Sequence, residues 1–283
     1  MVQTAAARDE RDAVPDRADE PVVRFEHVAL AFDDKVVLED VSFTLAEGHT
    51  IIILGASGSG KSTILKIVTG LLRADAGSVW VNGRQIDQLT EQEMMPVRAD
   101  LGMIFQEGAL FDSLTVRENV GYKLYEETDM PLEQVHHRVE EVLGFIDLGE
   151  HIDKMPSELS GGQRRRVAIA RAMAFKPQIL LYDEATTGLD PITATTVDHE
   201  IIKLRDIEGV SSIVVTHQLR DAFYVATHMA VRAADGSVQI VPATPEKEAE
   251  SQFIMLKDGL VHFAGDAESL RHSTDEYLRT FLS

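Results

Sequence analysis

Eight residues in the first quarter of the chain restrict its fold more than any other feature. The segment GASGSGKS, residues 55–62, fits the pattern G-x-x-x-x-G-K-[ST] of a phosphate-binding loop. Four apolar residues, 51–54, come directly before it, as expected for a strand buried on both faces of a parallel sheet. Residues 62–72, directly after it, are predicted to be a helix. The sequence therefore predicts an α/β fold in which a buried strand leads through this loop into a helix.

The residue types of the loop suit a triphosphate, although a glycine-rich turn can also match by chance. Glycines allow backbone N–H groups to turn inward as an anion nest, and the N-terminus of the following helix adds to it. We expect Lys61 to reach the β- and γ-phosphates and the Ser62 hydroxyl to bind Mg²⁺. The nucleotide is expected to contact Gly55, Ala56, Ser57, Gly58, Ser59, Gly60, Lys61, Ser62 and Thr63.

A second apolar strand ends in two carboxylates. Residues 179–182 read Ile-Leu-Leu-Tyr, and Asp183 and Glu184 follow. At the carboxyl edge of the sheet, Asp183 is placed to hold Mg²⁺ through water. Glu184 is expected to point toward the γ-phosphate and to polarise the attacking water. Acidic residues also end many strands without such a role, and the upstream phosphate loop favours the catalytic interpretation.

Composition excludes several kinds of partner and site. The chain has 47 acidic and 27 basic residues, a formal net charge of −20 that would repel nucleic acid. It contains no cysteine, which excludes disulfides and thiolate metal sites. No apolar run approaches the roughly 20 residues that span a bilayer, and residues 1–19 lack the apolar stretch of a signal peptide. A membrane role therefore requires docking on the helices of another subunit.

Residues 159–163, Leu-Ser-Gly-Gly-Gln, form a further candidate anion site ahead of a predicted helix at 167–175. Ser160 is an N-cap residue type, and Gly161 and Gly162 leave backbone N–H groups unshielded. This segment is either a local turn or a helix start that caps a phosphate held by another subunit. With Gln163, it resembles the signature of the ATPases of ATP-binding cassette (ABC) transporters.

The resemblance implies roles for further residues. Gln106 resembles the Q-loop glutamine, which contacts Mg²⁺ or water. Asp190, in Gly-Leu-Asp at 188–190, resembles the D-loop aspartate at the dimer interface. His217 resembles the switch histidine that contacts the γ-phosphate. Phe32 is the candidate for the aromatic that stacks on adenine, with an ordinary core residue as the alternative.

The resemblance covers about residues 22–230 and has one departure. Ala185 stands where the family usually has proline, and this change relaxes φ without removing a reacting group. The implied fold is that of P-loop NTPases: a RecA-like mixed sheet, an N-terminal antiparallel β subdomain and an inserted α-helical subdomain. The expected organisation is a disordered acidic tail at 1–20, an ATPase domain at 21–265 with a helical subdomain at about 107–175 and a polar insertion at about 233–252, and a C-terminal helix at 266–283.

Residue patterns predict the individual elements. Residues 232–252 are polar and form either a hairpin or a flexible insertion. Residues 253–256 and 260–263 are expected to form a hairpin. Further strands are expected at 22–32, 36–45, 79–81, 101–105 and 212–216, and helices at 114–125, 131–147 and 192–206.

The resemblance also implies partners. Two copies of such an ATPase enclose two ATP with Mg²⁺, so a homodimer is expected, with a membrane permease docked near residues 108–120. Residues 105–111, 114–120, 155–158 and 190–193 are similar to the ATPases of Mla-type phospholipid transporters, which work with MCE-domain proteins, and a small accessory cytoplasmic subunit is a further expected partner. The expected location is the cytoplasmic side of a bacterial inner membrane.

Three alternatives remain open. The first is the ATPase of an importer for small polar solutes such as amino acids. The second is an ABC protein that acts on ribosomes or DNA, which would carry two cassettes or a basic surface. The third is a P-loop kinase, which would need a substrate lid and no equivalent of residues 159–163.

Overall fold

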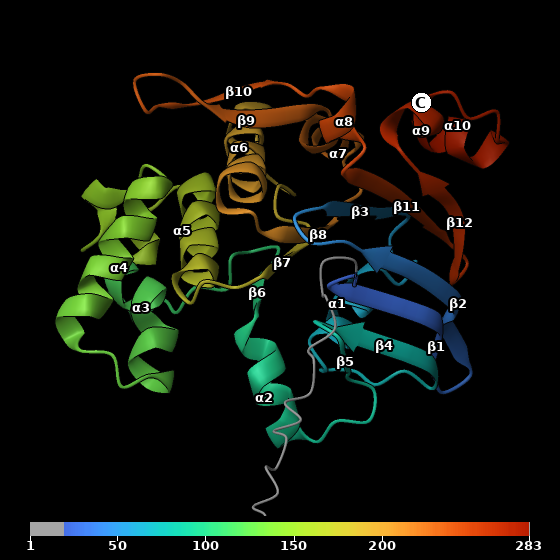
Figure 1. The fold of residues 1–283 in the computed structure, drawn as a ribbon, viewed down its shortest axis with the longest axis horizontal. Coiled ribbons are helices and arrows are strands. Elements are labelled where there is room, and N and C mark those ends of the chain that lie inside the picture. The colour runs from blue at the N-terminus through green and yellow to red at the C-terminus, as the bar shows by residue number, and fades with distance from the viewer. Residues whose placement is uncertain (1–19, 283) are drawn as a thin grey trace, which may run out of the picture.

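The computed structural model describes residues 20–282, and the predicted tail, apart from Glu20, lies outside them. Within this range a ten-stranded sheet runs through the molecule in the order β5-β4-β1-β2-β12-β11-β3-β8-β7-β6 (Figure 1). One end of the sheet is antiparallel and the other is parallel. The α/β fold with a mixed sheet is confirmed.

The antiparallel end is built by N-terminal strands. Strand β1 (Val23–Phe32) pairs with β2 (Lys35–Leu45) on one side and with β4 (Ala76–Val81) on the other, and the short β5 (Arg84–Gln85) adds to β4. The strands predicted from 22 to 45 are confirmed. Their turn lies at Asp33, whose φ is +52°.

The parallel end contains the strands that carry the candidate site. They are β3 (Thr50–Gly55), β6 (Leu101–Ile104), β7 (Ile179–Asp183), β8 (Ser211–Val215) and β11 (Ser251–Lys257). Strand β12 (Leu260–Gly265) returns antiparallel to β11, as the predicted hairpin requires, and joins β2 through Leu260 and Asp40.

Two hydrophobic clusters cover the two faces of this sheet. Along β3, Ile51 and Ile53 belong to the cluster that contains helix α1 (Lys61–Val68). Ile52 and Leu54 belong to the cluster that contains α5 (Gly161–Ala174) and α6 (Pro191–Glu208). Successive side chains of a strand point to opposite faces, so an apolar run fills both. Helix α1 ends before the predicted residue 72 because Gly70 turns the chain with a φ of +68°.

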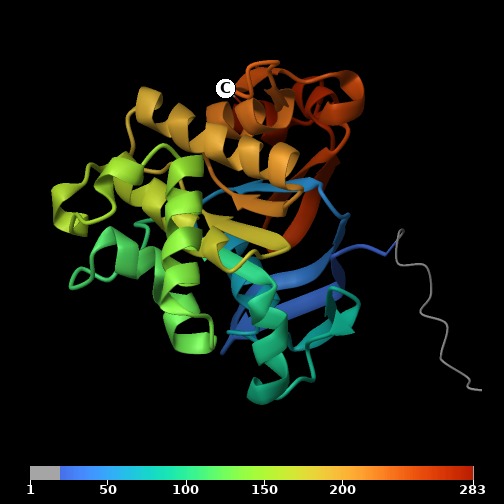
Figure 2. The ribbon, with the colours of Figure 1, turned by 60° about the vertical axis from the view of Figure 1, so that its left-hand side comes forward.

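A helical lobe packs at the parallel end of the sheet (Figures 1 and 2). It contains α3 (Val116–Glu127), α4 (Leu132–Phe145), two 3₁₀ turns, η2 (Gly149–His151) and η3 (Pro156–Glu158), and α5 (Gly161–Ala174). The three helices predicted between residues 114 and 175 are confirmed in type, and the third begins earlier than predicted, at Gly161. Pro131 is the N-cap of α4, one position before the predicted first turn.

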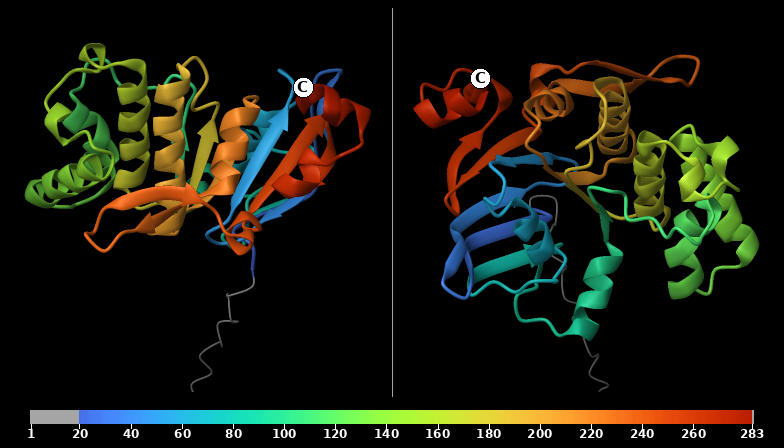
Figure 3. Two further views of the ribbon diagram at one scale, coloured as in Figure 1. Left: turned by 90° about the horizontal axis from the view of Figure 1, so that it is seen from above. Right: turned by 180° about the vertical axis from the view of Figure 1, so that it is seen from behind.

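The remaining segments differ more from expectation. In the polar interval, β10 (Val238–Pro242) pairs with β9 (His228–Arg232) and is followed by α8 (Pro245–Glu248), so the hairpin interpretation is the correct one. The single C-terminal helix was wrong: α9 (Ala267–Arg271) and α10 (Glu276–Leu282) are separate, because Asp275 caps a new helix by accepting from the Leu278 amide. Figure 3 shows these helices at the side of the sheet opposite the helical lobe.

Helices α2, α6 and α7 complete the fold. Helix α6 (Pro191–Glu208) matches the helix predicted at 192–206, whereas α2 (Glu91–Ala99) and α7 (Leu219–Thr227) were not predicted. In residues 20–282, no helix combines the length and apolar character needed to cross a membrane.

Candidate nucleotide-binding site

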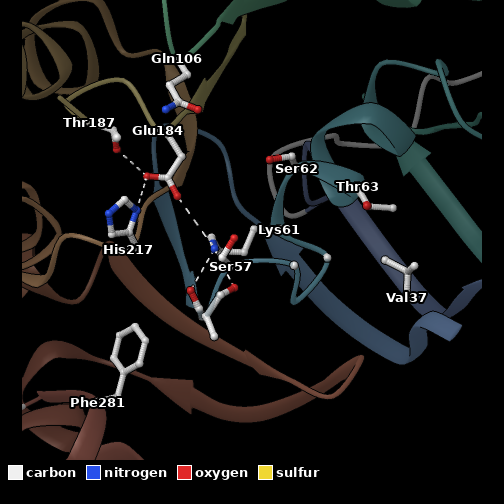
Figure 4. A pocket seen from close by; sticks show the side chains of 14 residues that line it. Val37, Ser57, Lys61, Ser62, Thr63, Gln106, Glu184, Thr187, His217 and Phe281 are labelled. Carbon is white, nitrogen blue, oxygen red and sulfur yellow. Dashed lines mark hydrogen bonds and ion pairs between the residues drawn. The ribbon is translucent and has the colours of Figure 1, made fainter. Parts of the chain in front are cut away.

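A cavity of about 630 Å³ opens at the carboxyl ends of the parallel strands (Figure 4). Its size lies within the range of about 300–1,000 Å³ common for small-molecule sites. Its lining comes from the phosphate loop, the ends of β6, β7 and β8, strand β2 and the C-terminal helix: Val37, Gly55, Ala56, Ser57, Gly58, Gly60, Lys61, Ser62, Thr63, Gln106, Glu184, Thr187, His217 and Phe281.

The phosphate loop is held closed by Lys61. Its ammonium donates to the carbonyl oxygens of Gly55 and Ala56 at 2.9 and 3.1 Å. A Cβ on Gly55 would lie 2.5 Å from Ser59 Oγ and 2.7 Å from the carbonyl oxygen of Leu256, so only glycine fits between loop and neighbouring strand. The lysine predicted to bind phosphate thus already faces the cavity from the first turn of α1.

Two carboxylates face the buried Lys61 ammonium. Glu184 Oε1 lies 3.9 Å from Lys61 Nζ. Burial lowers the pKa of Lys61, and the negative charges of Glu184 and Asp183 partly oppose that shift. The charge of the Lys61 ammonium is therefore opposed by burial and favoured by these two acids.

Ser62 and Asp183 come together beside the loop. The Ser62 hydroxyl donates to Asp183 Oδ1 at 2.7 Å. A hydroxyl and a carboxylate oxygen are hard ligands of the type that Mg²⁺ prefers. Gln106 lines the same cavity from the segment after β6. These side chains therefore fit the predicted Mg²⁺ site. Strands β6, which precedes Gln106, and β7, which ends at Asp183, are adjacent in the sheet.

Glu184 is oriented by two neighbours (Figure 4). Its Oε2 accepts from the Thr187 hydroxyl at 2.7 Å and lies 2.7 Å from His217 Nδ1. Its backbone has a φ of +53°, a conformation that costs free energy for a residue other than glycine. The Glu184 amide is fixed in this conformation by the carbonyl oxygen of Val215, at 2.9 Å.

The structure does not bring every predicted residue to this cavity. Phe32 is 46% exposed at the end of β1 and does not line it. Ser59, also in the phosphate loop, does not line it, and its buried hydroxyl has no hydrogen-bond partner among residues 20–282. Asp183 does not line it either and reaches it only through its hydrogen bond from Ser62. The other predicted contacts that do not line it are Ser160, Gly161, Gly162, Gln163 and Asp190.

The starts of helices α5 and α6 form a second surface. Ser160 is the N-cap of α5 and exchanges capping bonds with Gln163. Asp190 caps α6 by accepting from the Ile192 and Thr193 amides, and hydrogen bonds from Thr193 lower its pKa. The two helix starts touch, since a Cβ on Gly162 would lie 2.1 Å from Thr193 Cγ2.

Three residues of the cavity were not predicted. Thr187, three positions after Glu184, donates to it, and a hydroxyl so close in sequence is a signal that could have been used. Val37 and Phe281 reach the cavity from β2 and α10. Nothing in their local sequence indicates this, because their positions depend on the tertiary fold.

Comparison with known proteins gives matches over most of the chain. A family described as "ABC transporter" matches residues 38–187. The chain is 34% identical over 253 residues to the intermembrane phospholipid transport system ATP-binding protein MlaF of Escherichia coli (strain K12), covering 87% of this chain and 94% of MlaF. It is 38% identical over 247 residues to the methionine import ATP-binding protein MetN of Bifidobacterium longum (strain NCC 2705), covering 83% of this chain and 61% of that MetN.

A solved structure agrees with the fold. The dimeric post-hydrolysis state of the ATP-binding cassette MJ0796, bound to ADP and Pi, superposes with a TM-score of 0.69 at 30% identity. The match covers 86% of this chain and 98% of that cassette. Together these similarities cover the phosphate loop, the acidic strand end and the start of α5.

Proposed function

This chain belongs to the ABC transporter family, and from that premise we propose that it powers phospholipid transport between envelope membranes from the cytoplasmic face of a bacterial inner membrane. As an ABC ATPase, it binds ATP with Mg²⁺ and hydrolyses it. The observation that carries the proposed site is the convergence of Lys61, Ser62, Glu184 and His217 at one cavity, with Asp183 hydrogen-bonded to Ser62 beside it.

The phosphate loop binds the triphosphate in this proposal. Backbone N–H groups between Gly55 and Thr63 surround the phosphate oxygens, and the start of α1 adds its positive end. Lys61 exchanges its contact with Glu184 for the β- and γ-phosphates, because a triphosphate carries more negative charge than one carboxylate. Ser62 and Asp183 would hold Mg²⁺, with Gln106 lining the same cavity, and the ion would neutralise phosphate charge.

Glu184 is the proposed general base. Once Lys61 turns to the phosphates, Glu184 Oε1 is free to accept a proton from the attacking water. Thr187 and His217 hold the other oxygen and so fix the carboxylate. His217 also faces the cavity and is placed to donate to the γ-phosphate.

A homodimer completes the site. Ser160, Gly161, Gly162 and Gln163 lie outside the cavity of their own chain, which supports a role for them over the γ-phosphate of a second copy. Next to Asp190, Ile192 is 82% exposed, as expected for an apolar side chain that a partner covers.

Phe32 and the loop after β6 are proposed contact sites. Phe32 is exposed beside the β1–β2 turn, where its ring is available for adenine. For the permease, the proposed dock near residues 108–120 is supported by two exposed rings, Phe111 and Tyr122, whose centroids lie 4.6 Å apart. Leu110 is partly buried against the hydrophobic cluster that contains α5 and α6, so it is a weaker candidate for the permease contact.

The cargo is proposed from similarity. Phospholipid transport is supported by the resemblance at residues 105–120 and by the extent of the MlaF match, 94% of that protein. An MCE-domain protein and a small accessory subunit are the matching proposed partners. The second candidate is amino-acid import, which the 38% identity to MetN favours.

Two experiments test this proposal. Glu184→Gln in the purified chain should bind ATP with Mg²⁺ but hydrolyse almost none, whereas the exposed Glu126→Gln should keep normal turnover; normal turnover by Glu184→Gln would remove the proposed base. For the cargo, the complex should be purified from membranes and its partners identified. An MCE-domain protein with bound phospholipid supports lipid transport, and a solute-binding protein supports import.

A further inference from the structure

Two buried carboxyl groups lie between helices α6 and α7. Asp198 and Asp221 are 1% and 3% exposed, and both line a small cavity of about 10 Å³. Neither carboxyl oxygen of Asp198 has a hydrogen-bond partner among the described residues, and the same holds for Asp221 Oδ2. Two ionised carboxylates in such a space would repel each other and lack solvation, so one of them is expected to carry a proton.

This cavity is directly behind the proposed catalytic residues. Its lining includes Ala185 and Thr186, which follow Glu184, and Thr216, which precedes His217. The volume is close to the smallest that accommodates one water molecule, about 10–15 Å³. A change in the charge or spacing of the two carboxyls therefore acts on both strand ends at once.

Arg220 connects the pair to the start of α6. It donates to Asp221 Oδ1 at 2.9 Å and to the Pro191 carbonyl oxygen and Thr195 hydroxyl at 3.0 Å each. Its distance to Asp198 Oδ2 is 3.9 Å, too long for a hydrogen bond. Arg220 is half exposed and already paired with Asp221, so it compensates that carboxylate. Asp198 has no closer counter-charge within residues 20–282.

We propose that Asp198 and Asp221 share one proton, and that Asp198 is thereby a positioning residue for Glu184 and His217. In the protonated pair, a carboxyl–carboxylate hydrogen bond, direct or through one water, holds α6 against α7. Asp190, the predicted D-loop residue, is the N-cap of α6, and α7 follows His217. The pair therefore connects the proposed dimer interface to the proposed γ-phosphate contact. Ionisation of both carboxyls would push the two helices apart.

The surroundings of Asp198 favour its protonated form. Burial, and then the charge of Asp221, raise the pKa of Asp198 to about 8, while Arg220 opposes the shift. The other ionisable group that faces it from α7 is Tyr224, whose own pKa the Asp198 charge helps to raise. The strand-end segments contribute hydroxyl and apolar groups, Thr186, Thr216, Val214 and Val215 among them.

The first test measures stability without nucleotide and so does not depend on the ATPase proposal. Asn mimics a protonated carboxyl, hence Asp198→Asn should fold. The folded-state pKa of Asp198 lies above its unfolded value, so the stability due to its proton is lost as pH rises toward about 8. Between pH 5 and 8, the Tm of the unmodified chain should therefore fall relative to the Tm of Asp198→Asn. Above pH 8 the difference between the two Tm values should stay constant. Glu208→Gln, an exposed neutralisation on α6, should not show this difference.

The second test measures ATPase activity and rests on the proposed function. Above pH 8 the unmodified chain should lose kcat several-fold with KM for ATP changed less than about twofold, and Asp198→Asn should lack this loss. Asp198→Ala should lose kcat about fivefold or more at all pH values. Identical pH profiles of Tm for Asp198→Asn and the unmodified chain, failure of Asp198→Asn to fold, or full kcat in Asp198→Ala would each overturn the inference. Absence of ATPase activity in every variant, with the Tm difference present, would instead count against the function.

Discussion

Asp183 accepts a 2.7 Å hydrogen bond from Ser62, a residue 121 positions away in the chain. The contact forms because β3 and β7 flank β8 in the parallel sheet, so the loop after β3 and the end of β7 meet at one edge. Carboxyl edges of parallel strands are where such folds place their ligands. The hydrogen bond marks the point at which Mg²⁺ is expected to be held.

Removing the Ser62 hydroxyl or the charge of the Asp183 carboxylate should weaken Mg²⁺ binding. Ser62→Ala and Asp183→Asn should each raise the Mg²⁺ concentration for half-maximal ATPase activity about tenfold or more, because each loses a hard oxygen ligand or its charge. Titration of activity with Mg²⁺ at saturating ATP measures this. The exposed Ser157→Ala is the control, and an unchanged Mg²⁺ requirement in both variants would contradict the assignment.

Lys61→Ala should lose tight binding of the phosphates. The ammonium is the buried cation of the loop, and its loss should raise the Kd for ATP about 100-fold, or about 2.7 kcal/mol. Affinity for inorganic triphosphate should fall to a similar degree. Lys66→Ala, on the exposed side of the same helix, should bind as before. Unchanged affinity in Lys61→Ala would remove the lysine from the site.

Phe32→Ala tests the contact with adenine separately from the contacts with the phosphates. Stacking of an aromatic ring on a base contributes about 1–3 kcal/mol, so the Kd for ATP should rise about fivefold or more. Binding of inorganic triphosphate, which has no base, should stay the same. If ATP binding is unaffected, Phe32 is only an exposed strand-end residue, and Val37 or Phe281 becomes the candidate for the base contact.

Gly162 and Thr193 should show coupled effects on stability. Gly162→Ala places a methyl group 2.1 Å from Thr193 Cγ2 and should destabilise the fold by about 1–3 kcal/mol. Adding Thr193→Ser removes the Thr193 Cγ2 methyl group but keeps the hydroxyl that donates to Asp190. The double variant should therefore recover much of the lost stability. Chemical denaturation of the single and double variants measures the coupling.

Gly144→Ala is the matched control for this pair. A Cβ at Gly144 meets nothing within 4 Å, and alanine favours a helix over glycine by about 1 kcal/mol, so this variant should be as stable as the unmodified chain or more so. Additive losses in the Gly162 and Thr193 variants would contradict close packing between the two helix starts.

Local patterns account for what the sequence predicted. The phosphate loop, its flanking strand β3 and the apolar strands β7 and β8 are each a contiguous run of residues. The candidate residues Lys61, Asp183, Glu184 and His217 each lie in or next to one of these runs. The capping box of Thr90 and Glu93 is also a local signal, and it marks the start of the unpredicted helix α2.

Tertiary placement accounts for what the sequence did not predict. The cavity includes Phe281 only because the tertiary fold brings α10 to the phosphate loop. The pair Asp198 and Asp221 becomes visible only when α6 and α7 pack together. Hydropathy patterns cannot show which buried carboxyls lack partners, since this depends on distances between separate elements.

The central claim is that one ATP site is made by two copies of this chain. The most direct measurement is a structure of Glu184→Gln with ATP and Mg²⁺, since this variant should accumulate as the ATP-bound dimer. The account predicts Ser160 of the partner subunit within about 3 Å of the γ-phosphate that Lys61 binds. A dimer in which Ser160 of the partner subunit faces away from the nucleotide, or a monomer with fully ordered ATP, would contradict it.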